Sequence, residues 1–206
     1  MATPTHSELL IATNNAGKIR ELTGLLANLP LRLRQLSEFP HIKEVEETGK
    51  TFAENASLKA RLYGRQANLW ALADDSGLEV DALGGAPGVL SARYAGQNAT
   101  DVERNARLLA ELSLTDDERR TARFICVIAL YEPATGATEI FNGTCEGHIA
   151  QHPRGSNGFG YDSLFIPTGY THTFGELPDV VKQQISHRSR ALAAVRHYLN
   201  GRFSLP

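Results

Sequence analysis

The chain has few cysteines, little net charge and no long apolar run. Its two cysteines, Cys126 and Cys145, are too few for the disulfide framework of a secreted protein and indicate a reducing compartment. A formal net charge of -2 with interspersed signs argues against a basic surface that binds nucleic acid. Residues 1–8 lack the basic and apolar regions of a signal peptide, and no segment approaches the length of a membrane span. These absences predict a soluble, cytoplasmic protein with neither nucleic acid nor a membrane as partner.

The chain of 206 residues is long enough to bury a substantial core in one domain. Residues 9–12 form a short apolar run typical of a buried strand, and residues 18–29 repeat apolar residues at helical spacing. The pattern predicts a second helix at residues 51–68 and a strand at residues 69–73. The first part of the chain therefore alternates strands and helices.

The second part of the chain predicts antiparallel strands. After an expected helix at residues 101–112, two long strands are expected at residues 121–131 and 138–149, joined by a hairpin signal. A last helix is expected around residues 186–199. We therefore predict an α/β fold with a mixed central β-sheet flanked by helices. We expect residues 1–206 to form a single domain of two lobes with an active-site cleft between them.

Two adjacent carboxylates, Asp74 and Asp75, follow the apolar strand predicted at residues 69–73. Neighbouring carboxylates repel each other unless a positive charge lies between them, and hard oxygen ligands suit Mg²⁺ together with substrate phosphates. The pattern therefore indicates metal-assisted phosphate chemistry. An acidic turn is the alternative, because Asp, Ser and Gly are common turn residues.

The loop at residues 13–18 lies between the first predicted strand and the first predicted helix. Unpaired N–H groups at the start of a helix bind anions, and Lys18 adds a full positive charge. The loop is not a Walker A motif, because it lacks the first glycine and has Ile19 where that motif has Ser or Thr. An ordinary strand-to-helix turn is the alternative interpretation.

An acidic segment precedes the second predicted helix. Glu46 or Glu47 could complete an oxygen shell for Mg²⁺ if this segment folds over Asp74 and Asp75, and Lys59 could then point to a phosphate. A solvated loop is the alternative.

Two further segments carry candidate ligand-binding residues. The glycine-rich segment 155–162 holds two aromatic residues and a carboxylate, and glycines let the backbone approach a ligand closely. Cations gather in residues 182–190, at the expected start of the last helix, where a helix favours anions. This arrangement suggests an anionic or electron-rich ligand. A tight loop and an exposed capping segment are the respective alternatives.

Taken together and in order, these segments resemble the inosine triphosphate pyrophosphatases, also called non-canonical purine nucleoside triphosphate pyrophosphatases or XTP/dITP diphosphatases. The resemblance covers nearly the whole chain. The matching segments are residues 12–18, residues 46–49 with 51–52 and 54–56, residues 73–88 with 91–94, residues 158–162 and residues 185–188.

The resemblance implies hydrolysis of ITP, dITP or XTP to the monophosphate and pyrophosphate, with Mg²⁺ as cofactor, by a homodimer. It implies that Asp75 is the catalytic residue, acting as general base or metal-bound carboxylate. The metal-binding candidates are Glu46, Glu47, Asp74 and Asp75. The implied substrate-binding residues are Thr13, Asn14, Asn15, Ala16, Gly17, Lys18, Lys59, Ser76, Phe159, Gly160, Tyr161, Asp162, Lys182, His187 and Arg188.

Base selection can be argued from hydrogen bonding in the implied base site. Phe159 would stack on the purine, and a donor such as Arg188 would meet O6 of hypoxanthine or xanthine but the amino group of adenine. Exclusion of guanine nucleotides from this site would need a hydrogen-bond donor or a backbone group near C2 of the base. Two alternatives are a nucleotide-binding regulator without turnover, and a pyrophosphatase for a modified pyrimidine nucleotide.

Overall fold

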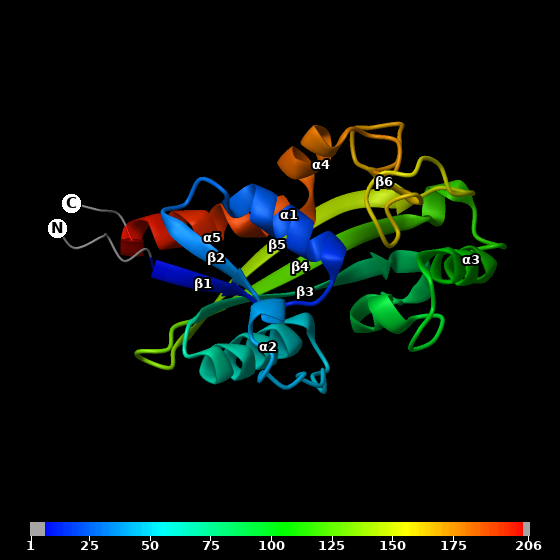
Figure 1. Cartoon of the computed structure of the whole chain (residues 1–206). Coiled ribbons are helices and arrows are strands. Elements are labelled where there is room, and N and C mark those ends of the chain that lie inside the picture. Colours follow the sequence, from blue (N-terminus) through cyan, green and yellow to red (C-terminus); the bar gives the residue numbers. More distant parts are fainter. Residues whose placement is uncertain (1–6, 204–206) are drawn as a thin grey trace. The chain divides into compact units, whose positions relative to one another are not determined.

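The computed structural model describes residues 7–203, and its elements are labelled in Figure 1. The strands are β1 (Ser7–Ile11), β2 (Leu31–Gln35), β3 (Trp70–Val80), β4 (Thr121–Tyr131), β5 (Thr138–Ile149) and β6 (Phe165–Pro167). The α-helices are α1 (Ala16–Leu26), α2 (Phe52–Ala67), α3 (Asp101–Glu111), α4 (Asp179–Ile185) and α5 (His187–Phe203). Short 3-10 helices are η1 (Leu36–Glu38), η2 (Asp81–Leu83), η3 (Gly88–Arg93) and η4 (Asp117–Arg119).

The six strands form one mixed sheet in the order β2-β1-β3-β4-β5-β6. β1 pairs in parallel with β2 and with β3, placing Leu9 opposite Leu33 on one side and Trp70 on the other. β5 and β6 pair antiparallel. The predicted α/β fold with a mixed sheet and helices is confirmed, since parallel strands joined through helices and antiparallel strands occur in one sheet.

Two predictions of secondary structure need correction, and three elements were not predicted. β3 does not end at residue 73 but runs through Asp74 and Asp75 to Val80, so this acidic segment is neither a strand end nor a turn. β2, β6 and α4 were not predicted. Lys182 lies in α4 and not at the start of the last helix, which begins at His187.

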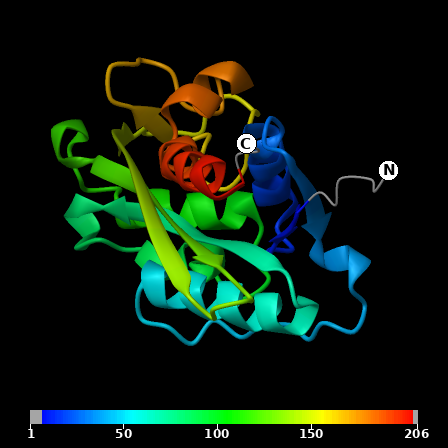
Figure 2. The ribbon, with the colours of Figure 1, turned by 90° about the vertical axis from the view of Figure 1, so that its left-hand side faces the viewer.

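The described residues divide into two compact units, and each is built from its own elements. The first unit comprises residues 7–75, 127–142 and 191–203. Within it, α2 lies on one face of the strands, and α1 and α5 lie on the other (Figures 1 and 2). α2 begins with a capping box, in which Thr51 accepts from the Glu54 amide and the Glu54 side chain accepts from Thr51.

The second unit comprises residues 76–126 and 143–190. Its core gathers aromatic rings, with Phe124 and Phe165 at 4.6 Å between centroids and Phe165 and Phe174 at 5.5 Å. Arg120 is buried and donates to the backbone oxygens of Leu112 and Thr115, which fixes the chain that follows α3. These contacts anchor α3 against the rest of the unit.

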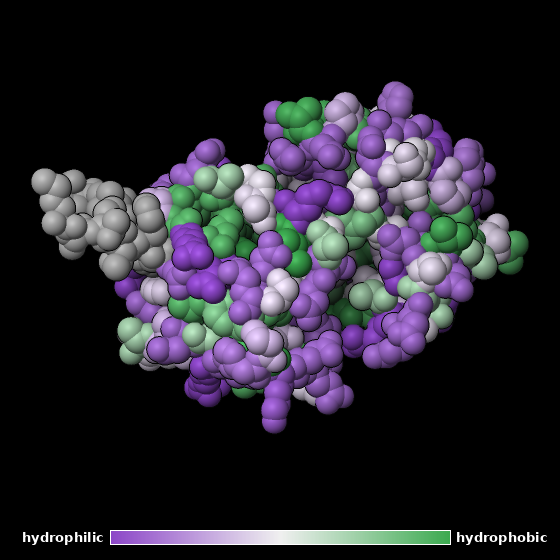
Figure 3. Space-filling model, in the orientation of Figure 1, coloured by the Kyte–Doolittle hydropathy of each residue, from purple (hydrophilic) through white to green (hydrophobic). Residues whose placement is uncertain are grey.

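The face of the molecule drawn in Figure 3 is mostly hydrophilic, with smaller apolar areas among the polar side chains. Within residues 7–203, each helix is too short or too polar to span a bilayer.

A glycine in the interior of α2 allows close packing, and this gives a first testable prediction. A Cβ on Gly64 would overlap the buried Tyr131 ring and lie 3.0 Å from Ala71 Cβ. Overpacking of this kind costs about 1–3 kcal/mol. For a chain of this size, about 1 kcal/mol shifts the melting temperature by about 2–4 °C. We expect Gly64→Ala to lower the melting temperature by about 2–10 °C in a thermal unfolding experiment.

The matched control is Gly24→Ala in α1. Gly24 is exposed, and a Cβ there meets nothing within 4 Å. Alanine is a better helix former than glycine by about 1 kcal/mol, so this variant should melt about 2–4 °C higher than the parent chain. Equal melting temperatures for the two variants would contradict the close approach of Gly64 to Tyr131.

Candidate active site

The loop after β1 leads into the N-terminus of α1. Asn15 caps the helix, since its side chain accepts a hydrogen bond from the Lys18 amide at 3.0 Å. Thr13 Oγ1 in turn accepts from the Asn15 amide at 3.2 Å. Asn14 and Ala16 are exposed here. Because the first N–H groups of a helix lack partners within it and carry partial positive charge, the loop can receive an anion.

Asp74 and Asp75 lie in the middle of β3, where both are buried. Successive side chains of a strand point to opposite faces of the sheet. Asp74 Oδ1 accordingly pairs with Lys18 Nζ from α1 at 2.5 Å, whereas Asp75 Oδ1 pairs with Lys59 Nζ from α2 at 3.1 Å. The two neighbouring carboxylates are therefore neutralised by lysines from different helices.

Lys59 lies at the centre of this group, with a side chain that is 9% exposed. Its ammonium donates to Glu47 Oε1 at 2.6 Å, to the Asp74 backbone oxygen at 2.9 Å and to Asp75 Oδ1 at 3.1 Å. Burial alone would lower the pKa of Lys59, but the charges of Asp75 and Glu47 outweigh burial and raise this pKa. We call Lys18, Glu47, Lys59, Asp74 and Asp75 the carboxylate–lysine cluster.

The two oxygens of Asp75 have different surroundings. Oδ1 contacts Lys59, while the buried Oδ2 has no hydrogen-bond partner among the described residues. Burial raises the pKa of Asp75, and the positive charges of Lys59 and Lys18 oppose this rise. A buried carboxylate with one oxygen still available can accept a proton or bind a cation.

The loop before α2 is fixed by its own hydrogen bonds, and this places Glu47. The Val45 amide donates to the Tyr63 hydroxyl at 3.1 Å, and the Gly49 amide donates to Asn55 Oδ1 at 2.8 Å. A Cβ on Gly49 would lie only 2.6 Å from that same Asn55 oxygen, so glycine is required for the close approach. Glu47 lies between these two anchored positions, which holds it within reach of Lys59.

Glu47 and Asp75 are the two carboxylates of this cluster that meet at Lys59. Among residues 7–203, no group of three or more His, Cys, Asp or Glu side chains has a geometry that could hold a metal by itself. However, Glu47 and Asp75 both contact the Lys59 ammonium, so their oxygens converge on one positive charge. Mg²⁺ commonly binds one or two carboxylates and completes its shell with water and substrate phosphates. Glu46 is exposed, whereas Glu47 contacts Lys59.

A second group of predicted site residues lies in the second unit. Arg188 is 1% exposed and donates to Ser76 Oγ at 2.9 Å. Lys182 Nζ lies 4.8 Å from the centroid of the Phe159 ring, and Arg188 Cζ lies 5.7 Å from it. Lys182 also forms an ion pair with Asp162. We call Ser76, Phe159, Asp162, Lys182 and Arg188 the aromatic–cation cluster.

Two other residues implied for the base site have aromatic side chains in the interior of the second unit. The His187 ring stacks on Phe124 with 4.7 Å between centroids. The Tyr161 hydroxyl donates to the Ser91 backbone oxygen at 2.9 Å, and burial raises the pKa of Tyr161. Both contacts support the walls around the aromatic–cation cluster.

The loop at residues 158–162 carries Phe159, Gly160 and Asp162 of the predicted set. The Phe159 amide donates to Asp162 Oδ2 at 2.8 Å. Gly158 has a positive φ of 76°, and a Cβ on it would overlap the Asp162 carboxylate. Asp162 therefore closes the loop from within, and only glycine fits at position 158.

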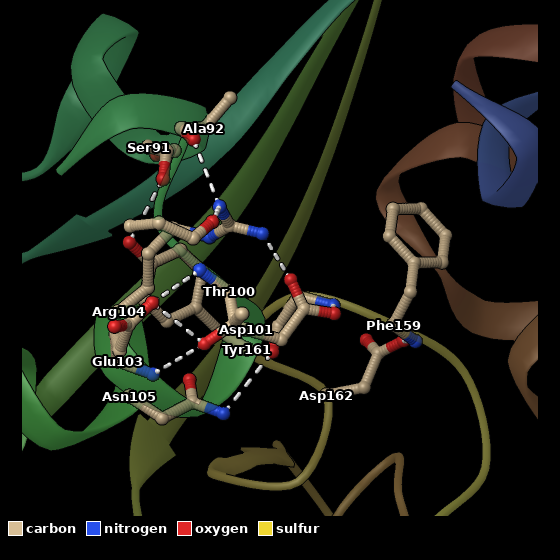
Figure 4. Close-up of polar contacts among 12 residues, drawn as sticks. Ser91, Ala92, Thr100, Asp101, Glu103, Arg104, Asn105, Phe159, Tyr161 and Asp162 are labelled. Atoms are coloured by element: carbon tan, nitrogen blue, oxygen red, sulfur yellow. Dashed lines mark hydrogen bonds and ion pairs between the residues drawn. The ribbon is translucent and has the colours of Figure 1, made fainter. Parts of the chain in front are cut away.

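Sequence reasoning missed the residues of α3 that contact this loop. Asp101 Oδ2 accepts from the Gly160 amide at 2.7 Å, and Asn105 Nδ2 donates to the Gly160 backbone oxygen at 3.2 Å (Figure 4). A signal was present, because Asn105 occupies the same helical face as the buried Leu108 and Leu112. A polar residue on an apolar stripe indicates a buried hydrogen bond.

Comparison with known proteins identifies the family. The sequence profile of the Ham1 family matches residues 9–198. This chain belongs to the Ham1 family. A curated relative from Geobacter sulfurreducens, named dITP/XTP pyrophosphatase, is 50% identical over 193 residues, which is 94% of this chain and 96% of that protein.

Solved structures of Ham1 proteins have the same fold. A HAM1 protein from Coxiella burnetii matches with a TM-score of 0.86 and 46% identity, over 95% of this chain and 99% of that one. A Mycobacterium abscessus protein titled nucleoside-triphosphatase / dITP/XTP pyrophosphatase matches with a TM-score of 0.74 and 44% identity, over 91% and 97%. The mixed sheet with its helices is therefore the Ham1 fold.

Proposed function

We propose that this chain is a dITP/XTP pyrophosphatase, which hydrolyses non-canonical purine nucleoside triphosphates to the monophosphate and pyrophosphate. The observation that carries this proposal is the 50% identity to a dITP/XTP pyrophosphatase over 94% of the chain. The carboxylate–lysine cluster supplies chemistry of the kind that this reaction needs. Phosphoryl transfer depends on positioning and on stabilising charge, and no covalent nucleophile is required.

The triphosphate is assigned to the first unit. Lys18 and Lys59 bring two positive charges to the cluster, and the exposed start of α1 adds N–H groups aimed at an anion. Together they would hold the phosphates so that the α-phosphorus meets the attacking water.

Asp75 is assigned as the group that activates this water. Its buried Oδ2 is the atom that would take the proton while the water oxygen bonds to the α-phosphorus and the α–β phosphoanhydride bond breaks. Mg²⁺, when bound by Glu47 and Asp75, would neutralise charge on the leaving pyrophosphate. Asp74 pairs with Lys18 and thereby fixes one of the cations.

The purine base is assigned to the aromatic–cation cluster. The Phe159 ring offers a stacking surface, and the Arg188 guanidinium has five N–H donors, one of which goes to Ser76. A donor at O6 accepts hypoxanthine and xanthine and rejects the amino group of adenine. Asp75 and Ser76 are consecutive in β3, so the phosphate-binding and base-binding residues are joined directly by the chain.

The family resemblance also supports assembly as a homodimer in the cytoplasm, where the chain would remove deaminated purine nucleotides before polymerases use them. Sedimentation of the purified protein tests the dimer: a single species of twice the mass of the 22.5 kDa chain is expected.

The decisive experiment measures pyrophosphate release from dITP, ITP, XTP, dGTP, dATP and the pyrimidine nucleotide dCTP, with Mg²⁺ and with a chelator. We expect kcat/KM for the first three to exceed that for dATP by about 10²-fold or more, because a donor facing an amino group leaves both unpaired. Chelation should abolish release from all of them.

Three outcomes would contradict the proposal or one of its parts. Binding of dITP without release would indicate a nucleotide-binding regulator. Equal rates for purine and pyrimidine triphosphates would contradict the base assignment, and equal rates for dGTP and dITP would contradict a group that excludes the guanine amino group.

A further inference from the structure

Helix α3 holds the loop that carries Phe159 by both peptide groups next to Gly160. The N–H of the Phe159–Gly160 peptide donates to Asp101 Oδ2 at 2.7 Å. The oxygen of the Gly160–Tyr161 peptide accepts from Asn105 Nδ2 at 3.2 Å. Asp101 and Asn105 are four residues apart and share one face of α3, so a single helical turn grips both peptides (Figure 4).

The Asp101 carboxylate is itself fixed. Its Oδ1 pairs with the Arg104 guanidinium, which also donates to the backbone oxygens of Ala92 at 3.0 Å and of Ala99. The helix start beneath it is closed by a capping box of Thr100 and Glu103, which Figure 4 shows beside Asp101. Although its side chain is 42% exposed, Asp101 is therefore held by Arg104 where it accepts from the Gly160 amide.

Stability alone does not explain why an asparagine occupies position 105. It is 6% exposed and lies on the same helical face as Leu108 and Leu112, where an apolar residue would pack. Asparagine is a poor residue for a helix interior, and burying an amide costs free energy unless it is fully hydrogen-bonded. Its Nδ2 bonds to Gly160 and to Ser163 Oγ at 3.1 Å, but its Oδ1 has no partner among the described residues. Asn105 therefore lowers stability in the helix, and in return its Nδ2 fixes the loop at Gly160.

Contacts within the second unit also hold the loop that carries Phe159. Asp162 closes the loop through the Phe159 amide, and the Tyr161 hydroxyl ties the far side to Ser91. Gly158 and Gly160 both have positive φ, at 76° and 63°, so the backbone around Phe159 has little resistance of its own to bending. The contacts of Asp101 and Asn105 therefore add a support from α3 to the internal Asp162 contact that fixes the backbone at Phe159.

We propose that Asp101 and Asn105 are positioning residues for the purine base: they fix Phe159 so that its ring is presented to the base, without contacting the nucleotide. This inference rests on the proposed function, because it takes the stacking partner of Phe159 to be a purine. Loosening the grip would then raise KM and weaken discrimination between bases, while the carboxylate–lysine cluster would keep its chemistry.

The test uses Asn105→Asp and Asp101→Asn, which keep the shape of each side chain. The first removes both N–H donors, and the second removes the charge that pairs with Arg104. Val102→Ala is the matched control, because Val102 lies on the same helix and is 76% exposed. For each variant, hydrogen exchange of the amides at 158–163 and the kinetics of pyrophosphate release from dITP and dGTP are measured.

We expect the 158–163 amides of both test variants to exchange about tenfold faster, which corresponds to about 1.4 kcal/mol, while amides of residues 71–73 keep their rates. We expect KM for dITP to rise about tenfold with kcat within about twofold, and the dITP:dGTP ratio of kcat/KM to fall. Val102→Ala should match the parent in every readout. A variant that merely unfolds in part would lose kcat with KM unchanged.

The outcomes separate this inference from the proposed function. Unchanged exchange at 158–163, or a fall in kcat with KM unchanged, would overturn the positioning role while wild-type release from dITP still supports the enzyme. If the wild type binds dITP without releasing pyrophosphate, the proposed function fails. The dissociation constant of dITP then replaces KM as the test of whether Asp101 and Asn105 position Phe159. A wild type that neither binds nor hydrolyses dITP would overturn both.

Discussion

Asp75→Asn should slow pyrophosphate release from dITP by about 10³-fold, within the range lost when a general base is removed. The amide keeps an oxygen for Lys59, but it can neither take a proton from water nor bring a negative charge to Mg²⁺. The loss should fall on kcat more than on KM, because the lysines that hold the phosphates remain. Steady-state kinetics at saturating Mg²⁺ measure both.

The same variant should not be less stable than the parent at neutral pH. Burial raises the pKa of Asp75 in the folded chain above its unfolded value, so its ionisation costs folding free energy as pH rises through the folded pKa. A neutral amide avoids this cost. Asp116→Asn is the matched control, because Asp116 has a side chain that is 80% exposed and pairs with Arg119 on the surface. An Asp75→Asn variant that retains full activity while folded would remove Asp75 from the mechanism.

The sequence predicted the types of residue in the site better than their pairings. Periodicity placed Lys18 at the start of α1 and Lys59 within α2, and both positions are confirmed. It also ended the strand before Asp74, because two charged residues and a glycine interrupt an apolar run. β3 continues since Lys18 and Lys59 neutralise the two carboxylates from different helices, a tertiary effect that no local pattern records.

The elements that sequence reasoning missed are short or polar for physical reasons. β2 is a five-residue edge strand in which Leu31 and Leu33 alternate with Arg32 and Arg34, a short alternation that was not interpreted as a strand, and its arginines protect the edge. The sequence pattern starts the last helix near Ser186 and gives no helix before it, whereas Ser186 is extended between α4 and α5 and its hydroxyl accepts from the Ser189 amide. A capping serine therefore separates Lys182 from Arg188 in the chain, and folding returns both to Phe159.

Lys59→Met should have opposite effects on activity and stability as pH changes. Lys59 lowers the pKa of Asp75, so its removal should raise that pKa further and leave more of the carboxylate protonated at a given pH. Because the proposed mechanism needs the ionised form, we expect kcat/KM at neutral pH to fall about 10²-fold or more and to recover in part as pH rises. A pH profile of kcat/KM measures the shift of its acid limb.

The stability of Lys59→Met should fall, not rise, as pH rises. Removing one partner of a buried ion pair leaves Asp75 and Glu47 with an uncompensated charge, which costs about 3–5 kcal/mol in urea unfolding at neutral pH. In the variant, the folded pKa of Asp75 lies above its unfolded value, so stability is fully present below the unfolded pKa and is lost as pH rises through the folded one. The variant should therefore be most active where it is least stable. The matched control is Lys50→Met, at an exposed lysine in the loop before α2, and it should change neither pH profile. Parallel pH profiles for activity and stability in Lys59→Met would show that Lys59 acts on the phosphates alone and does not tune Asp75.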